Sequence, residues 1–116
     1  MNFSDAEGRL FWPVYDEYAD RRKKLAANRI AILQNYMSNY DNLTNEKAEE
    51  LTEKIFKNNT QLDKLQMKYY KEMKKAVSPL RASQFMQLEG YLQTMIRYEI
   101  QEALPFIGQL EQRKIN

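Results

Sequence analysis

The sequence contains no cysteine and no histidine, and only three glycines and three prolines among 116 residues. The two missing residue types exclude disulfides, thiol chemistry, histidine general bases and the usual zinc ligands. Scarce glycine and proline leave little material for turns, so a few long elements are expected. No apolar run approaches the roughly 20 residues that a membrane span needs. We therefore expect a single helical domain over residues 1–116, without a membrane span.

Positive and negative charges nearly balance, with 18 lysines and arginines against 16 acidic residues. This balance does not by itself indicate a polyanionic partner. The cations of residues 21–24 point about 100° apart on a helix, so they surround its axis and form no strip. Five lysines do share one helix face, which is typical of a solvated surface, with nucleic acid or a membrane surface as alternatives. They are Lys57, Lys64, Lys68, Lys71 and Lys75.

The usual signatures of catalysis are missing. Gly8, Gly90 and Gly108 are isolated, whereas a phosphate-binding or dinucleotide-binding loop needs clustered glycines. Two-metal bundle enzymes need Glu-x-x-His pairs, which a chain without histidine cannot supply. We predict no catalytic residue, no cofactor, no metal site and no small-molecule substrate.

Three short patterns indicate where helices begin. Ser4, Thr44 and Ser78 each follow an apolar residue and precede a helical pattern. A hydroxyl at this position accepts a hydrogen bond from a free backbone N–H of the first turn. Ser4 also has Glu7 three residues later, which completes a capping box. Three caps predict three helices.

The predicted fold is all-α, with three long antiparallel helices over about residues 5–40, 45–77 and 79–104. Short gaps between the helices favour an up-down-up order and an elongated shape. Pro13 lies well past the first turn and lacks an N–H, so we expect a kink in the first helix near it.

The last helix carries a broad apolar arc. Its predicted inward face consists of Phe85, Leu88, Leu92, Met95, Ile96 and Ala103. The same arc predicts a protein-binding or dimer face made of Leu80, Tyr91, Met95 and Tyr98. A three-helix sheet cannot cover so wide an arc, and a large uncovered patch is typical of an interface. The prediction is a homodimer.

A polar layer is also predicted at one height of the bundle. Arg29, Asn58 and Glu99 each fall on the predicted inward face of a different helix, at similar heights if each residue rises about 1.5 Å. An unpaired inward carboxylate is costly, so we expect an Arg29–Glu99 ion pair with Asn58 beside it. The alternative is that Arg29 and Glu99 each extend to solvent.

The order of these motifs resembles the Spy/CpxP-like superfamily, small periplasmic helical proteins named for Leu-Thr-x-x-Gln motifs at helix starts. The matching caps are residues 3–7 and 77–81, neither of which ends in Gln. The resemblance extends to two further groups, which span most of the chain. They are Phe11, Trp12, Pro13, Val14, Tyr15 and Tyr18 early, and Ser78, Pro79, Phe85, Gln87, Leu88 and Glu89 late.

The resemblance implies an exported helical protein of the bacterial envelope, often a curved homodimer, whose leader is expected to have been removed before Met1. Better-known relatives act as ATP-independent chaperones or stress-sensor regulators that bind proteins on a concave face. Metal-linked relatives use histidine or cysteine, so metal sensing is not carried over to this chain. We expect a non-enzymatic protein-binding role, with two alternatives. They are a helical adaptor for one specific partner and, third, a cytoplasmic nucleic-acid binder.

Overall fold

The computed structural model describes residues 2–103, and these form three long α-helices. The helices are α1 (Asp5–Ser38), α2 (Asn45–Ala76) and α3 (Pro79–Glu102), with a short 3-10 helix, η1 (Tyr40–Asn42), after α1. No strand occurs in this part of the chain. The all-α, three-helix prediction is confirmed, and its boundaries lie within about two residues of those observed.

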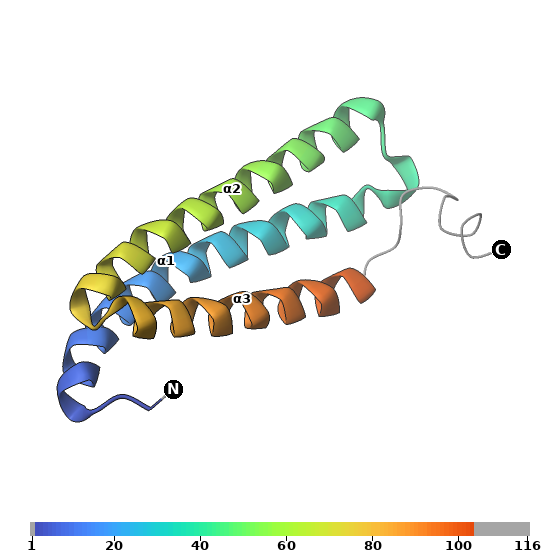
Figure 1. Ribbon diagram of the computed structural model, residues 1–116. Helices are drawn as coiled ribbons and strands as arrows, with labels where there is room; N and C mark the ends of the chain where they lie inside the picture. Colours follow the sequence, from blue (N-terminus) through green and yellow to red (C-terminus); the bar gives the residue numbers. More distant parts are fainter. Residues whose placement is uncertain (1, 104–116) are drawn as a thin grey trace.

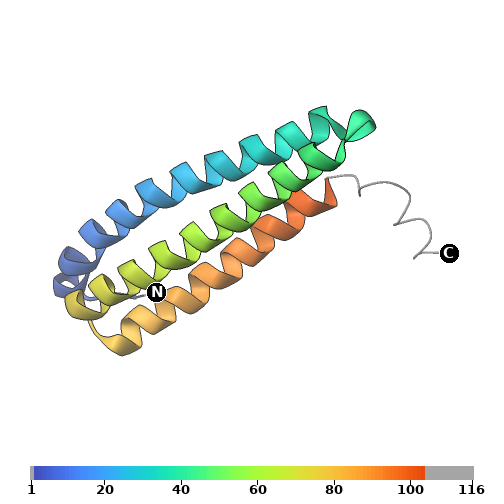
Figure 2. The ribbon, with the colours of Figure 1, turned by 90° about the horizontal axis from the view of Figure 1, so that it is seen from above.

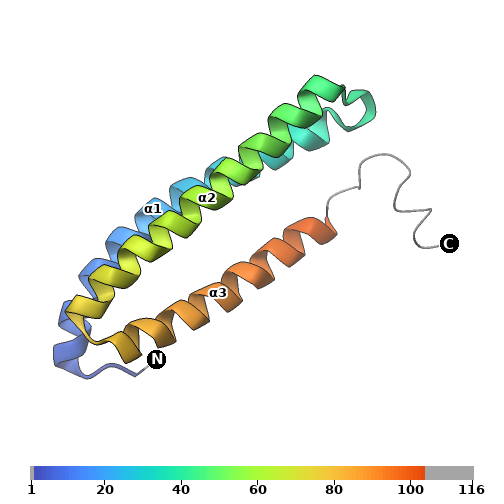
Figure 3. The same ribbon diagram turned by 45° about the horizontal axis from the view of Figure 1, so that its top comes forward.

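The molecule is long and thin, measuring 55 × 29 × 17 Å. The helices α1 and α2 form an antiparallel hairpin, and α3 returns along α2 (Figures 1 and 2). Figure 3 shows that α3 is set apart from the hairpin. No Cα atom of α1 lies within 8 Å of a Cα atom of α3, so side chains alone join these two helices.

All three helices begin at the predicted caps. The hydroxyl oxygens of Ser4, Thr44 and Ser78 each accept a hydrogen bond of 3.1 Å from a first-turn N–H. At Ser4 the capping box is complete, since the Ser4 N–H donates to Glu7 Oε1 at 3.1 Å. This backbone hydrogen bond is the main reason that the pKa of Glu7 is lowered.

The first helix bends without breaking at Pro13. The helix continues through Pro13 from Asp5 to Ser38, and its first turns point away from the axis of the remainder (Figure 1). Proline has no N–H and its ring crowds the carbonyl four residues earlier, so the helix must open on that side. The predicted kink is present.

The core lies at the end of the hairpin where α3 begins. Its buried members are Phe11, Tyr18, Tyr69, Met73, Ala82 and Phe85. Residue spacing predicts an inward stripe on each of the first two helices, and every member is buried or half-buried. The members are Phe11, Val14, Tyr15, Tyr18, Leu25, Ile32, Leu33, Tyr36 and Tyr40 for the first helix, and Ala48, Leu51, Ile55, Leu62, Leu65, Tyr69, Met73 and Ala76 for the second. The stripe predicted for α3 is wrong for all but Phe85, as described below.

Toward the η1 end, α1 and α2 pack on each other through smaller clusters. Ile32, Leu51 and Leu62 are buried there. Asn58 is 3% exposed and is held because its Oδ1 accepts from Asn28 Nδ2 at 2.9 Å. A buried amide needs such a partner to offset the loss of water.

Candidate functional site

Aromatic rings join the start of α3 to α1. The ring centroid of Phe85 lies 5.4 Å from that of Phe11, 5.7 Å from that of Tyr15 and 6.1 Å from that of Tyr18. All three pairs meet edge to face, the arrangement that the ring quadrupole favours. These contacts fix the first turns of α3 against α1.

One turn further along α3, a buried carboxylate joins α3 to α1. Glu89 is 2% exposed, and both its oxygens accept from Arg22 Nη1 at 2.9 Å. The Tyr18 hydroxyl also donates to Glu89 Oε2, and Gln66 Nε2 of α2 donates to the Tyr18 hydroxyl at 3.4 Å. A carboxylate can be buried here because cation and phenol together replace its water.

The same contacts shift the acidity of the groups around the carboxylate. Burial, followed by the hydrogen bond to Glu89, raises the pKa of Tyr18. Burial opposes the charge of Arg22, but its hydrogen bond and ion pair with Glu89 outweigh this, and the pKa of Arg22 is raised. The guanidinium also lies 5.4 Å from the centroid of the Tyr18 ring. The cluster therefore keeps a neutral phenol beside a paired carboxylate and guanidinium.

Between α1 and α3 lies a groove of about 410 Å³. Its lining is mainly apolar. The lining from α1 and the preceding residues consists of Phe3, Phe11, Trp12, Tyr15, Arg22, Lys23 and Ala26. The lining from α3 consists of Phe85, Leu88, Glu89, Leu92, Gln93 and Ile96. We call this the α1–α3 groove.

The apolar face of α3 continues from the groove to the outside of the molecule. Leu80, Tyr91, Met95 and Tyr98, the predicted binding face, are 69%, 63%, 44% and 63% exposed. Leu88, Leu92 and Ile96, predicted to be buried, are also exposed. At about 100° per residue, these seven side chains occupy one arc of α3. We call it the α3 apolar face.

The inward face predicted for α3 is corrected accordingly. The side chains that α3 buries are Ala82, Phe85 and Glu89. Hydrophobic spacing placed the leucines inward, but the hydrogen bonds that Tyr18 and Arg22 donate to Glu89 hold the Glu89 side of the helix toward the bundle. The apolar side chains turn outward as a result.

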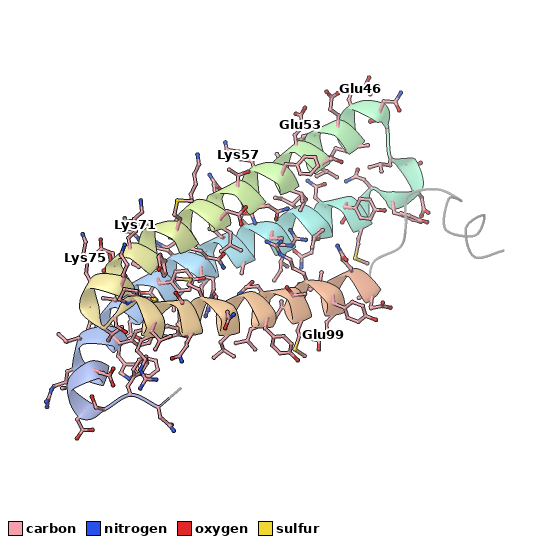
Figure 4. The ribbon with its side chains drawn as sticks, viewed as in Figure 1. Glu46, Glu53, Lys57, Lys71, Lys75 and Glu99 are labelled. Atoms are coloured by element: carbon pink, nitrogen blue, oxygen red, sulfur yellow. The ribbon has the colours of Figure 1, made fainter. Side chains whose placement is uncertain are left out.

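The predicted polar layer is wrong in its ion pair. Asn58 is buried as expected, but Glu99 is exposed and points away from the hairpin (Figure 4). Within residues 2–103 no ion pair joins Arg29 to Glu99; Arg29 Nη1 instead donates to Asn59 Oδ1 at 2.9 Å. Glu99 lies ten residues after Glu89, which places it roughly 80° away around the helix.

The lysine face of α2 is solvated, as its spacing indicated. Lys57, Lys71 and Lys75 project from the outer edge of α2 (Figure 4), and Lys64 and Lys68 are also exposed. Glu46 and Glu53 occupy the same edge nearer the start of α2. The edge therefore carries both signs of charge, which weakens the nucleic-acid alternative.

Among the described residues, no group of three or more acidic side chains is arranged to hold a metal ion. None of the helices formed by residues 2–103 is both long enough and apolar enough to cross a membrane.

Sequence reasoning missed Glu89 as a functional residue. One signal was available: Arg22 lies four residues after the buried Tyr18 and on the same face of α1, where an acidic partner would stabilise its charge. Whether Glu89 or Glu99 faces the bundle depends on the rotation of α3 about its own axis, and residue spacing does not determine that rotation.

The fold and groove define an elongated all-α protein with one splayed helix and an exposed apolar face. No protein-family model, no curated protein and no solved structure matches this chain.

Proposed function

We propose that this protein is a non-enzymatic envelope protein that binds the surfaces of other proteins, in a chaperone-like or stress-regulatory role. The observation that carries the proposal is the α3 apolar face, whose seven large side chains are between 44% and 69% exposed. Contiguous apolar patches of this kind are rare on monomers without a binding role. The face adjoins the α1–α3 groove, so one continuous surface offers both a flat and a concave part.

Location in the periplasm is part of the same proposal and rests on the resemblance to Spy/CpxP-like proteins. Cell fractionation of a strain that expresses the natural gene tests it. Recovery from the cytoplasm alone would contradict this part of the proposal.

Binding is tested by suppression of aggregation with several unrelated, chemically unfolded clients. The key variant is Leu92→Lys/Met95→Lys, which places charges on the α3 apolar face. Its matched control is Phe56→Lys/Met67→Lys, which changes two exposed apolar residues of α2 instead. We expect the first variant to lose suppression and the control to retain it. Circular dichroism confirms that both are folded.

The alternative is a helical adaptor for one specific partner, which the defined shape of the α1–α3 groove favours. An adaptor does not suppress the aggregation of unrelated clients. Absence of suppression by the native protein would therefore contradict the chaperone role and leave the adaptor.

A further inference from the structure

Two arginines that lie one turn beyond lining residues of the α1–α3 groove have no acidic partner among residues 2–103. Arg29 follows the lining residue Ala26 by three positions on α1, and Arg97 follows the lining residue Gln93 by four positions on α3. Both are partly buried. Within residues 2–103 neither forms an ion pair, whereas Arg22, one heptad before Arg29, is paired with Glu89. The charge of Arg22 is therefore neutralised within the molecule, whereas those of Arg29 and Arg97 are not neutralised by any residue that the structure describes.

Arg29 is the less satisfied of the two arginines. Its Nη1 donates to a neutral amide oxygen, that of Asn59. Its Nε atom is buried without an acceptor, and no other described side chain buries a polar atom in this way. Burial, and then the nearby charge of Arg97, lower the pKa of Arg29. A partly buried cation that has an unsatisfied buried donor and a like charge nearby is an arrangement that an incoming anion would stabilise.

The surroundings indicate which kind of anion fits. Leu88, Leu92 and Ile96 line the groove, so an occupant must bring apolar side chains as well as charge. The concave shape suits a single chain segment better than a flat bilayer. Apolar side chains of both α1 and α3 line the groove. A partner helix laid along such a groove can contact both helices with its apolar side.

We propose that the α1–α3 groove binds an amphipathic helical segment of a partner protein through its apolar side and one carboxylate. The carboxylate lies between Arg29 and Arg97, where guanidinium groups can hold it with paired hydrogen bonds. The apolar side lies on Leu88, Leu92 and Ile96. This inference rests on the proposed function, since it names the chemistry of a ligand for the same surface.

The test uses fluorescence anisotropy with dye-labelled designed peptides and the full chain. One peptide forms an amphipathic helix with leucines on one side and glutamates at its border; the second has glutamine in place of each glutamate. We expect the glutamate peptide to bind about tenfold more tightly, because a charge-assisted hydrogen bond contributes more than a neutral one. In Arg29→Gln/Arg97→Gln this preference should disappear. The matched control, Lys57→Gln/Lys71→Gln, removes the same amount of charge from the outer edge of α2 and should keep the preference for the glutamate peptide.

Several outcomes would overturn the inference. Equal affinity for both peptides, or a preference that survives in Arg29→Gln/Arg97→Gln, would show that the arginines do not select a carboxylate. Binding of phosphatidylglycerol vesicles that depends on the two arginines, with no peptide bound, would assign the site to lipid instead. If neither peptide binds while aggregation is still suppressed, the groove is not the site and the proposed function stands.

Discussion

Arg22 of α1 and Glu89 of α3 form an ion pair of 2.9 Å that spans the two helices whose backbones do not touch. The carboxylate is 2% exposed and the guanidinium 21% exposed. The pair lies one turn beyond Phe85, whose ring contacts three aromatic rings of α1. It therefore sets both the rotation of α3 and the shape of the groove.

Removing one partner of this pair should be costly. Arg22→Met leaves a buried carboxylate with only the Tyr18 hydroxyl, and we expect a loss of about 3 kcal/mol in the free energy of unfolding. Glu89→Met should cost less, because the partly exposed guanidinium can turn to water. Urea denaturation of both single variants and the double variant measures the coupling. The double variant should lose much less than the sum.

The exposed pair Glu17–Arg21 is the matched control for this cycle. Its atoms are 3.7 Å apart and its side chains are 61% and 48% exposed. Its coupling energy should be close to zero. A similarly small coupling between Arg22 and Glu89 would contradict the role of their ion pair in positioning α3.

Stability should fall in alkali through Tyr18. The raised pKa of Tyr18 means that the folded protein keeps the phenol proton at pH values where the unfolded chain releases it. This contribution is complete below the unfolded value of about 10 and is lost as the pH rises above it, by up to about 1.4 kcal/mol per pH unit. Denaturation midpoints between about pH 9 and pH 11 measure the slope. Tyr18→Phe should flatten it, and Tyr91→Phe, at an exposed position, should not. Equal slopes in the native protein and Tyr18→Phe would contradict the prediction.

The caps should each contribute measurably to stability. Ser78→Ala removes the acceptor for the Arg81 N–H at 3.1 Å, and Thr44→Ala the acceptor for the Lys47 N–H at the same distance. Each should lower the free energy of unfolding by about 1 kcal/mol. Ser83→Ala, within α3 and exposed, serves as the control and should cause little change. Unchanged denaturant midpoints in both cap variants would show that these hydroxyls do not stabilise the helices.

The homodimer remains a prediction, and the α3 apolar face gives it a definite interface. A standard interface buries about 800 Å² on each partner, and the seven exposed side chains of this face are the apolar surface of α3 that a second copy could cover. Sedimentation at micromolar concentration should show a dimer. Tyr91→Lys/Tyr98→Lys should give a monomer, whereas Phe56→Lys/Met67→Lys on α2 should leave the dimer intact. A monomeric native protein would contradict the prediction.

The sequence by itself determined the helices. The hydroxyls of Ser4, Thr44 and Ser78 and the geometry of Pro13 act within one or two turns, so local chemistry is sufficient to place the boundaries and the bend. The inward faces of α1 and α2 could also be predicted, because nearly all their inward positions are apolar and burial of those side chains dominates the free energy of packing.

Only the tertiary structure decided the rotation of α3. This helix has apolar side chains over a wide arc, so turning it changes the buried apolar area little, and spacing alone favoured the leucines. The deciding interaction was between Glu89 and two residues about 70 positions earlier, Tyr18 and Arg22. The spacing of apolar residues cannot predict such an interaction, because its energy depends on which groups meet after the helices pack. The same rotation exposed the α3 apolar face and placed Glu99 at the surface.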